Sequence, residues 1–190
     1  ALLLAASPCA LAQEAVQFNA VLSIGAWSSN RVLDERSGVL APSLAVSAGA
    51  DVSEQVRLKF DGSVYRFPQD RGDSTRSALR EAFVQWYGEQ TEVRVGPQVF
   101  AWGRADRINP TDNLTARDYT SPFAVDDAQR IGAPALRVAR ELGGAGRLTA
   151  IAKRFRPSKG PSDRNELALP LRPSYGDKDE YALRFDHTGQ

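Results

Sequence analysis

The sequence predicts an all-β fold, an antiparallel transmembrane β-barrel, from three observations. Long segments alternate apolar and polar residues with period two, and a strand with this pattern has one apolar face and one polar face. The first of these segments directly follows a short apolar stretch that is typical of an export signal. Long and short connections alternate between the segments, as expected for a barrel with short periplasmic turns and longer outer loops.

The N-terminal stretch predicts export. Residues 2–12 are apolar and end in a box of small residues, which predicts cleavage after Ala12. The stretch is too short for a membrane helix, which needs about 20 apolar residues. We therefore expect residues 1–12 to be the remnant of a signal peptide and residues 13–190 to form an outer-membrane β-barrel. Cys9, the only cysteine, leaves with the signal, unless it carries a lipid anchor.

Five segments show the alternation most clearly, namely 16–27, 44–52, 56–65, 78–87 and 92–101. The first is long enough to cross a bilayer, which takes about 9–11 residues of a tilted strand. A strand in a soluble sandwich is usually shorter, with a mode of about 5–6 residues. The apolar face of the first segment is expected to carry Val16, Phe18, Ala20, Leu22, Ile24 and Ala26.

Three further segments, 134–142, 146–155 and 179–187, show a weaker alternation and bring the total to about eight strands. In the segment 78–87 the pattern places Ala78 on the apolar face together with Arg80, a charge on the side that is expected to meet lipid.

The connections predict which ends of the strands lie together. The long connections are expected at 28–42, 68–73, 103–133 and 156–178. The short turns between them lie at 53–54, 88–90 and 142–146. The sequence does not finish on a strand with a terminal aromatic residue, so we expect it to be the N-terminal part of a larger barrel, with about 14–18 strands by analogy with pore-forming barrels.

A box at residues 96–114 is the most distinctive motif. It reads Gly-Pro-Gln-Val-Phe-Ala-Trp-Gly-Arg-Ala-Asp-Arg-Ile-Asn-Pro-Thr-Asp-Asn-Leu. With the strand at 79–86, it resembles porin-like outer-membrane proteins of proteobacteria, in which a strand ending near Gln runs into Trp-Gly-x-x-Asp and then Asn-Pro-x-Asp. The resemblance covers about residues 77–120 and implies an outer-membrane barrel of a Gram-negative bacterium. Pro97 departs from the pattern because it removes a donor from the strand ladder.

The box begins the long connection 103–133, for which two interpretations stay open. An inward-folded loop commonly narrows the pore of such barrels, so the box can form part of a constriction. Alternatively, it is a rigid turn that pins the loop to the wall, because Asn and Asp bond their own backbone and Pro fixes φ. The residues concerned are Trp102, Gly103, Arg104, Asp106, Asn109, Pro110, Asp112 and Asn113.

Charged residues on the polar faces of the strands are expected to line the lumen, because a charge facing lipid costs about 2–4 kcal/mol at the bilayer midplane. One interpretation is a solvated wall of mutually paired charges. The other is a transverse field between a basic wall and acidic loop residues that orients polar solutes, although weak or no ion selectivity is expected. The residues concerned are Arg57, Lys59, Glu81, Glu92, Arg94 and Arg184.

The composition argues against several other functions. The 24 basic and 23 acidic residues are nearly balanced, which argues against a nucleic-acid partner. The sequence has no His or Cys cluster with metal-ligand spacing, no Gly-x-Ser-x-Gly elbow and no phosphate-binding loop, and His187 is its only histidine. We therefore expect no enzyme activity, no cofactor and no metal.

The function expected from the sequence is a porin-like channel for the passive passage of small polar solutes, with the loop 103–133 as its constriction. Its partners would be outer-membrane lipid and those solutes, and a homo-oligomer is compatible with the sequence. The main alternative is an outer-membrane barrel that acts as a scaffold or sheath for an exported protein complex. A barrel enzyme and a soluble periplasmic β-domain are the remaining alternatives.

Overall fold

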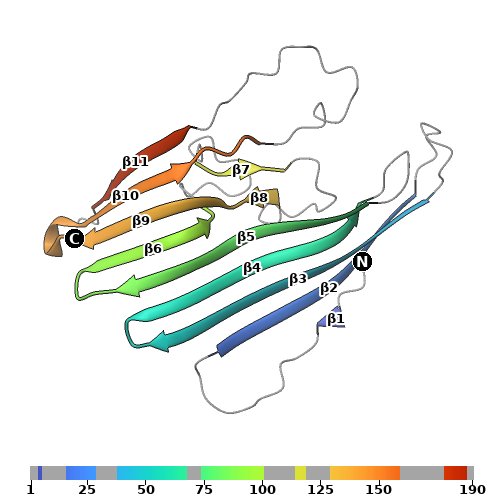
Figure 1. Cartoon of the computed structure of the whole chain (residues 1–190), viewed down its shortest axis with the longest axis horizontal. Coiled ribbons are helices and arrows are strands. Elements are labelled where there is room, and N and C mark those ends of the chain that lie inside the picture. The colour runs from blue at the N-terminus through green and yellow to red at the C-terminus, as the bar shows by residue number, and fades with distance from the viewer. Residues whose placement is uncertain are drawn as a thin grey trace.

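The computed structural model describes residues 4–5, 16–28, 38–67, 74–100, 114–118, 129–158 and 178–187. These residues form an all-β structure whose main part is one antiparallel sheet, which confirms the predicted all-β class. Figure 1 shows the strands lying side by side in a single layer, in the order β1-β2-β3-β4-β5-β6-β9-β10-β11. No helix in the described ranges is long and apolar enough to cross a membrane.

Eight long strands make up the sheet, close to the number that the sequence predicts. They are β2 (Val16–Ser28), β3 (Gly38–Ser53), β4 (Val56–Phe67), β5 (Ser74–Tyr87), β6 (Thr91–Gln98), β9 (Ala133–Glu141), β10 (Arg147–Arg154) and β11 (Asp179–Asp186). Three strands have two residues each, namely β1 (Leu4–Ala5), which pairs with β2, and β7 (Ala116–Arg117) and β8 (Arg130–Ile131), which pair with each other. A single 3-10 turn, Gly143–Ala145, connects β9 to β10.

The predicted alternation of long and short connections is present. The turns at 54–55, 88–90 and 142–146 join neighbouring strands at one end of the sheet, and the strand ends that the longer connections link lie at the other end. The first long connection is shorter than predicted because β3 begins at Gly38 and includes Pro42. Pro42 pairs with Ile24 on β2 but lies beyond the last pair with β4, Ser43 with Tyr65. A proline is tolerated at a place where the strand has a neighbour on one side only.

A β-bulge in β5 corrects the predicted face of two residues. Asp61 pairs with Glu81 and Gly62 pairs with Leu79, so Arg80 is an extra residue without a partner in the ladder. An inserted residue reverses which face the following side chains occupy. The prediction that Ala78 and Arg80 share the apolar face is therefore wrong. Leu79 takes that face, and the guanidinium Nε of Arg80 lies 3.4 Å from a carboxylate oxygen of Asp61 on the polar face.

The strand β6 ends at Gln98, before Val99 and Phe100, which the sequence places in the strand. Its pairing with β5 stops earlier, at Val95 with Val84. Gly96 follows with φ of 130°, and a Cβ there would collide with the carbonyl oxygen of Ala82, so only glycine fits. Pro97 lies beyond this point and pairs only with Pro134 on β9, where its missing donor costs no bond to β5.

In the described residues the sheet is open. Beyond β2 there is only the two-residue β1, and β11 forms the other edge. An open edge exposes unpaired N–H and C=O groups, which readily pair with a further strand.

Candidate functional site on the polar face of the sheet

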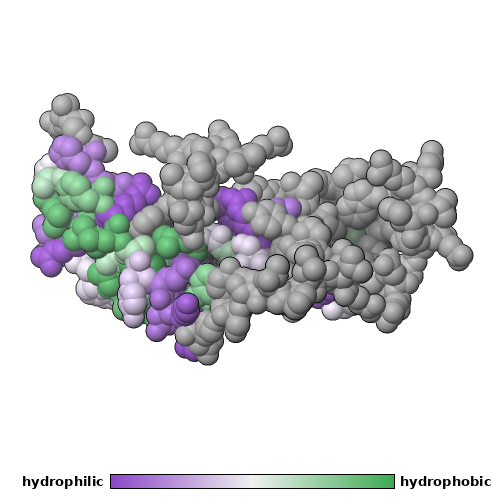
Figure 2. Space-filling view, turned by 90° about the horizontal axis from the view of Figure 1, so that it is seen from above, coloured by the Kyte–Doolittle hydropathy of each residue, from purple (hydrophilic) through white to green (hydrophobic). Residues whose placement is uncertain are grey.

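The apolar face of the sheet is its exposed face. Cross-strand pairs connect one apolar residue from every long strand into a row that crosses the whole sheet: Val16, Ala50, Leu58, Val84, Val95, Leu136, Ala152 and Tyr181. A second row contains Val56, Trp86, Val93, Val138, Ala150 and Leu183. Val16 is 68% exposed and Tyr181 is 77% exposed. Figure 2 shows hydrophobic side chains of the described residues gathered at the surface beside hydrophilic ones.

The polar face is the more buried one. A row between the two apolar rows contains Asp51, Arg57, Gln85, Arg94, Arg137, Ile151 and Ala182. Gln85 and Lys153 are each only 4% exposed. Lys153 forms an ion pair with Glu180 on β11. Apolar residues such as Phe83 and Ile151 are also buried on this face. The unusual feature is therefore the large exposed apolar surface on the opposite face, because such a surface marks contact with something other than water.

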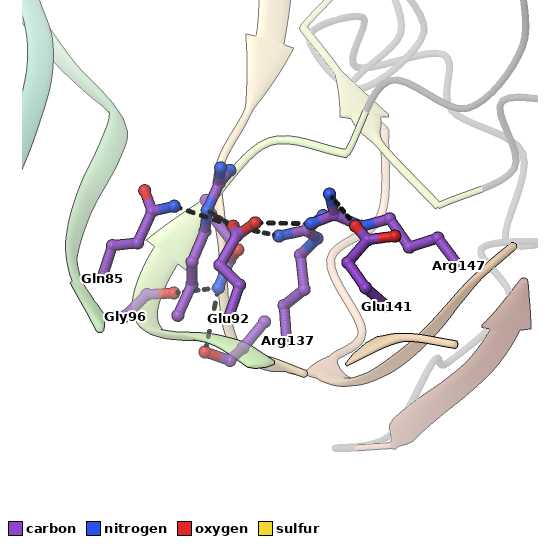
Figure 3. Close-up of polar contacts among 9 residues, drawn as sticks. Gln85, Glu92, Gly96, Arg137, Glu141 and Arg147 are labelled. Carbon is purple, nitrogen blue, oxygen red and sulfur yellow. Dashed lines mark hydrogen bonds and ion pairs between the residues drawn. The ribbon is translucent and has the colours of Figure 1, made fainter. Parts of the chain in front are cut away.

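Glu92 on β6 is the centre of an ion cluster on this face (Figure 3). Its oxygen Oε1 lies 2.8 Å from Nε of Arg94 and 2.5 Å from Nη1 of Arg137 on β9. Its other oxygen, Oε2, lies 2.5 Å from Nη2 of Arg147 on β10. The amide of Gln85 on β5 also donates to Oε1, at 2.8 Å. One carboxylate therefore connects four neighbouring strands, and its side chain is only 14% exposed.

The cluster extends toward the short turns. Arg147 uses its second nitrogen, Nη1, to pair with Glu141 at 2.9 Å. The guanidinium of Arg94 also lies 5.2 Å from the ring centre of Phe83, within the range of a cation–π contact. Each charged side chain of this cluster therefore has an oppositely charged neighbour, although Arg94 and Arg137 are direct cross-strand partners.

The six charged residues that the sequence places on the polar faces all lie on the polar face of the sheet. Arg57 forms a two-bond pair with Asp51 at 2.6 and 2.8 Å. Arg184 pairs with Asp186 at 2.5 Å. Glu92 and Arg94 belong to the ion cluster described above. Lys59 lies in the next row of the same face, where it pairs with Phe83, and Glu81 lies in the row after that, where it pairs with Asp61.

Sequence reasoning missed several residues that the fold brings to this site. Arg137 and Arg147 lie in segments whose alternation is weak, although Arg137 stands between the apolar residues Leu136 and Val138. Arg80 was missed because a bulge leaves no mark in a period-two pattern. With Arg80 turned to the polar face, a cation stands beside the opposed carboxylates Asp61 and Glu81.

All eight residues predicted for the constriction-loop box, Trp102, Gly103, Arg104, Asp106, Asn109, Pro110, Asp112 and Asn113, lie outside the described residues. The segments that flank them are described. The backbone N–H of Phe100 donates to Oγ1 of Thr115 at 3.1 Å, and the Thr115 hydroxyl donates to the carbonyl of Phe100. Phe100, Thr115 and Ala116 are all buried. The two ends of the box are therefore clamped together at the end of β6.

Gln98, which belongs to the box at residues 96–114, is only 1% exposed. Its amide donates to the carbonyl of Ala135 on β9 at 3.1 Å and to that of Gly96 at 3.3 Å. Gln98 therefore connects the backbone of β6 to that of β9 where β6 ends.

The chemistry that this arrangement offers is a polar surface of paired charges, backed by an exposed apolar surface. In the described residues no group of His, Cys, Asp and Glu side chains is arranged to hold a metal ion. Comparison with known protein families, with curated proteins and with solved structures gives no match for the chain.

Proposed function

We propose that the chain forms part of an outer-membrane β-barrel of a Gram-negative bacterium, a porin-like channel through which small polar solutes pass passively. The observation that carries this proposal is the pair of opposite faces. Large apolar side chains are exposed on one face of the sheet, whereas the charged side chains of the strands lie mainly on the other. Lipid outside and an aqueous lumen inside would satisfy both faces.

The dimensions of the apolar face support the same proposal. On β2 the apolar positions run from Val16 to Ala26. Ten residue steps at about 3.3 Å give about 33 Å of strand. A strand tilted by about 40° then covers about 25 Å along the membrane normal, which is the height of the apolar band on outer-membrane barrels.

The loop 103–133 is proposed to narrow this channel. The clamp between Phe100 and Thr115 holds the loop's first part near the end of β6, and the β7–β8 ladder brings its later part back toward the sheet. Pinning and constriction are compatible, because a loop needs fixed ends to hold a position across a pore.

Planar-bilayer recording of the full-length protein tests the proposal. Purified protein added to one chamber should produce stepwise increases in conductance. A membrane that stays silent with correctly folded protein would count against a channel.

A second candidate is a barrel that serves as a scaffold or sheath for an exported protein complex, with its lumen filled. The burial of Thr115 and Ala116 favours it, because it shows that part of the loop packs against protein. A closed pore together with stoichiometric co-purification of an exported partner would support this candidate over the channel.

A further inference from the structure

The sheet has a gap between β5 and β6 at the end that carries the long connections. The pairing of β5 with β6 stops at Val84 with Val95, although β5 continues to Ser74. In the described residues β8 and Gly132 lie beside this part of β5 instead (Figure 1). A Cβ on Gly132 would collide with the carbonyl oxygen of Arg80. The backbone at Gly132 therefore contacts the part of β5 that does not pair with β6.

A cavity of about 470 Å³ occupies this place. Its volume is in the range of small-molecule sites, about 300–1,000 Å³. Strands β4, β5, β6 and β8 and the ends of β7 and β10 all contribute to it. The lining residues are Tyr65, Arg76, Ser77, Ala78, Leu79, Pro97, Asp118, Gln129, Arg130, Ile131, Gly132 and Arg156.

The described lining is cationic on one part and apolar on another. Arg76, Arg130 and Arg156 contribute three guanidinium groups, against the single carboxylate of Asp118. A cleft lined mainly by one sign of charge concentrates solutes of the opposite sign. Because a guanidinium is planar and presents two parallel donors, it matches a carboxylate better than a point charge does.

The other lining residues indicate the rest of the ligand. Leu79, Pro97 and Ile131 offer apolar surface, and Tyr65, which is 6% exposed, closes one side. A wholly hydrophilic anion would gain nothing from this part of the cavity. An anion with an apolar body would bury that body there.

Backbone bonds hold the segments that carry the guanidiniums. The N–H of Asp118 donates to the carbonyl of Gln129 at 2.7 Å. This bond extends the β7–β8 ladder by one position beyond the pair of Arg117 with Arg130. The N–H of Arg117 donates to Oγ of Ser158 at 3.0 Å. The segment that carries Arg156 is therefore bonded to β7, which pairs with the strand β8 that carries Arg130.

We propose that this cavity is a binding site for small organic carboxylates with an apolar body. A role of this site in the passage of solutes rests on the proposed channel. Binding of the carboxylate itself does not require conduction. Arg76, Arg130 and Arg156 bind the carboxylate, and Leu79, Pro97 and Ile131 contact the apolar body.

Calorimetric titration of the full-length protein in detergent tests the proposal, with benzoate as the probe and benzamide as its neutral match. We expect benzoate to bind at least tenfold more tightly than benzamide. We also expect Arg76→Gln and Arg156→Gln each to weaken benzoate binding about fivefold or more. Arg154→Gln is the matched control, because Arg154 is exposed on the apolar face of β10 and does not line the cavity. This variant should leave the benzoate affinity unchanged.

Equal affinities for benzoate and benzamide, or the absence of binding by either, would overturn the proposal. So would unchanged benzoate binding in both Arg76→Gln and Arg156→Gln when each variant keeps the heat-modifiable mobility of the native protein. Bilayer recordings of the same preparations separate the two proposals. Benzoate binding without conductance refutes the channel alone, whereas conductance without benzoate binding refutes the carboxylate site alone.

Discussion

Replacing Glu92 by Gln removes the negative charge at the centre of the ion cluster but keeps the size of the side chain. Oε1 of Glu92 accepts from Gln85 and Arg137 and forms an ion pair with Arg94, and Oε2 accepts from Arg147. An amide has only one oxygen, so its NH₂ group would face one of these donors. With Arg147 opposite the NH₂ group, two donors would meet and neither would have an acceptor.

The expected loss of stability follows from the burial of this carboxylate. Removing one partner of a buried ion pair costs about 3–5 kcal/mol, because the remaining charge is left uncompensated. The Glu92 side chain is 14% exposed, and some of this loss is screened by water, so we expect about 2–4 kcal/mol. The charge of the group formed by Glu92, Arg94, Arg137 and Arg147 would rise from +2 to +3, which should raise the permeability to anions relative to cations.

Urea unfolding of the protein in lipid vesicles measures the first effect, and the reversal potential across a salt gradient measures the second. Glu89→Gln is the matched control, because Glu89 is exposed in the neighbouring turn. A surface change of this kind alters stability by less than about 0.5 kcal/mol. A double-mutant cycle with Arg137→Gln should give a coupling energy of about 1–3 kcal/mol. If Glu92→Gln is as stable as Glu89→Gln and shows no coupling to Arg137, the carboxylate does not hold these strands together.

Three further changes test the faces, the bulge and the loop. Leu183→Arg should prevent assembly into vesicles whereas Ala182→Arg should not, because the new charge faces lipid in the first variant and the polar side in the second, a difference of about 2–4 kcal/mol. Heat-modifiable mobility measures assembly. Equal behaviour of the two variants would contradict the assigned faces. Deleting Arg80 should remove the bulge and still permit assembly, because Leu79 and Glu81 would then pair with Gly62 and Asp61 as consecutive residues and keep their present faces. Arg80→Gln, which keeps the bulge, should also assemble. A deletion variant that fails to assemble would contradict the assignment of Arg80 as the extra residue. Asp106→Asn should shift the cation-to-anion permeability ratio if the loop narrows the pore, and an unchanged ratio would remove Asp106 from the constriction.

Much of the sheet could be predicted from local sequence. The strands β2, β4, β9, β10 and β11 lie within a few residues of their predicted bounds, because period-two alternation directly reports two faces in different surroundings. Strand ends were less predictable. β3 extends through Pro42 and β6 stops at Gln98, since these limits depend on where a neighbouring strand begins or ends.

The candidate site was only partly predictable. Glu92 and Arg94 could be placed on a polar face by alternation, but their partners Arg137 and Arg147 could not be chosen from sequence. The pairing of β6 with β9 across the connection 99–132 brings them together. The cavity at the β5–β6 gap was not predicted either, because it depends on where one strand leaves another.

By itself, the sequence determined that this chain forms long two-faced strands joined by alternating short and long connections, because both properties are written in the order of neighbouring residues. Only the tertiary structure decided which charges meet, which face Ala78 and Arg80 occupy, and where a cavity opens. The physical reason is that ion pairs, bulges and cavities depend on the register between strands, and register relates residues that are distant in the chain.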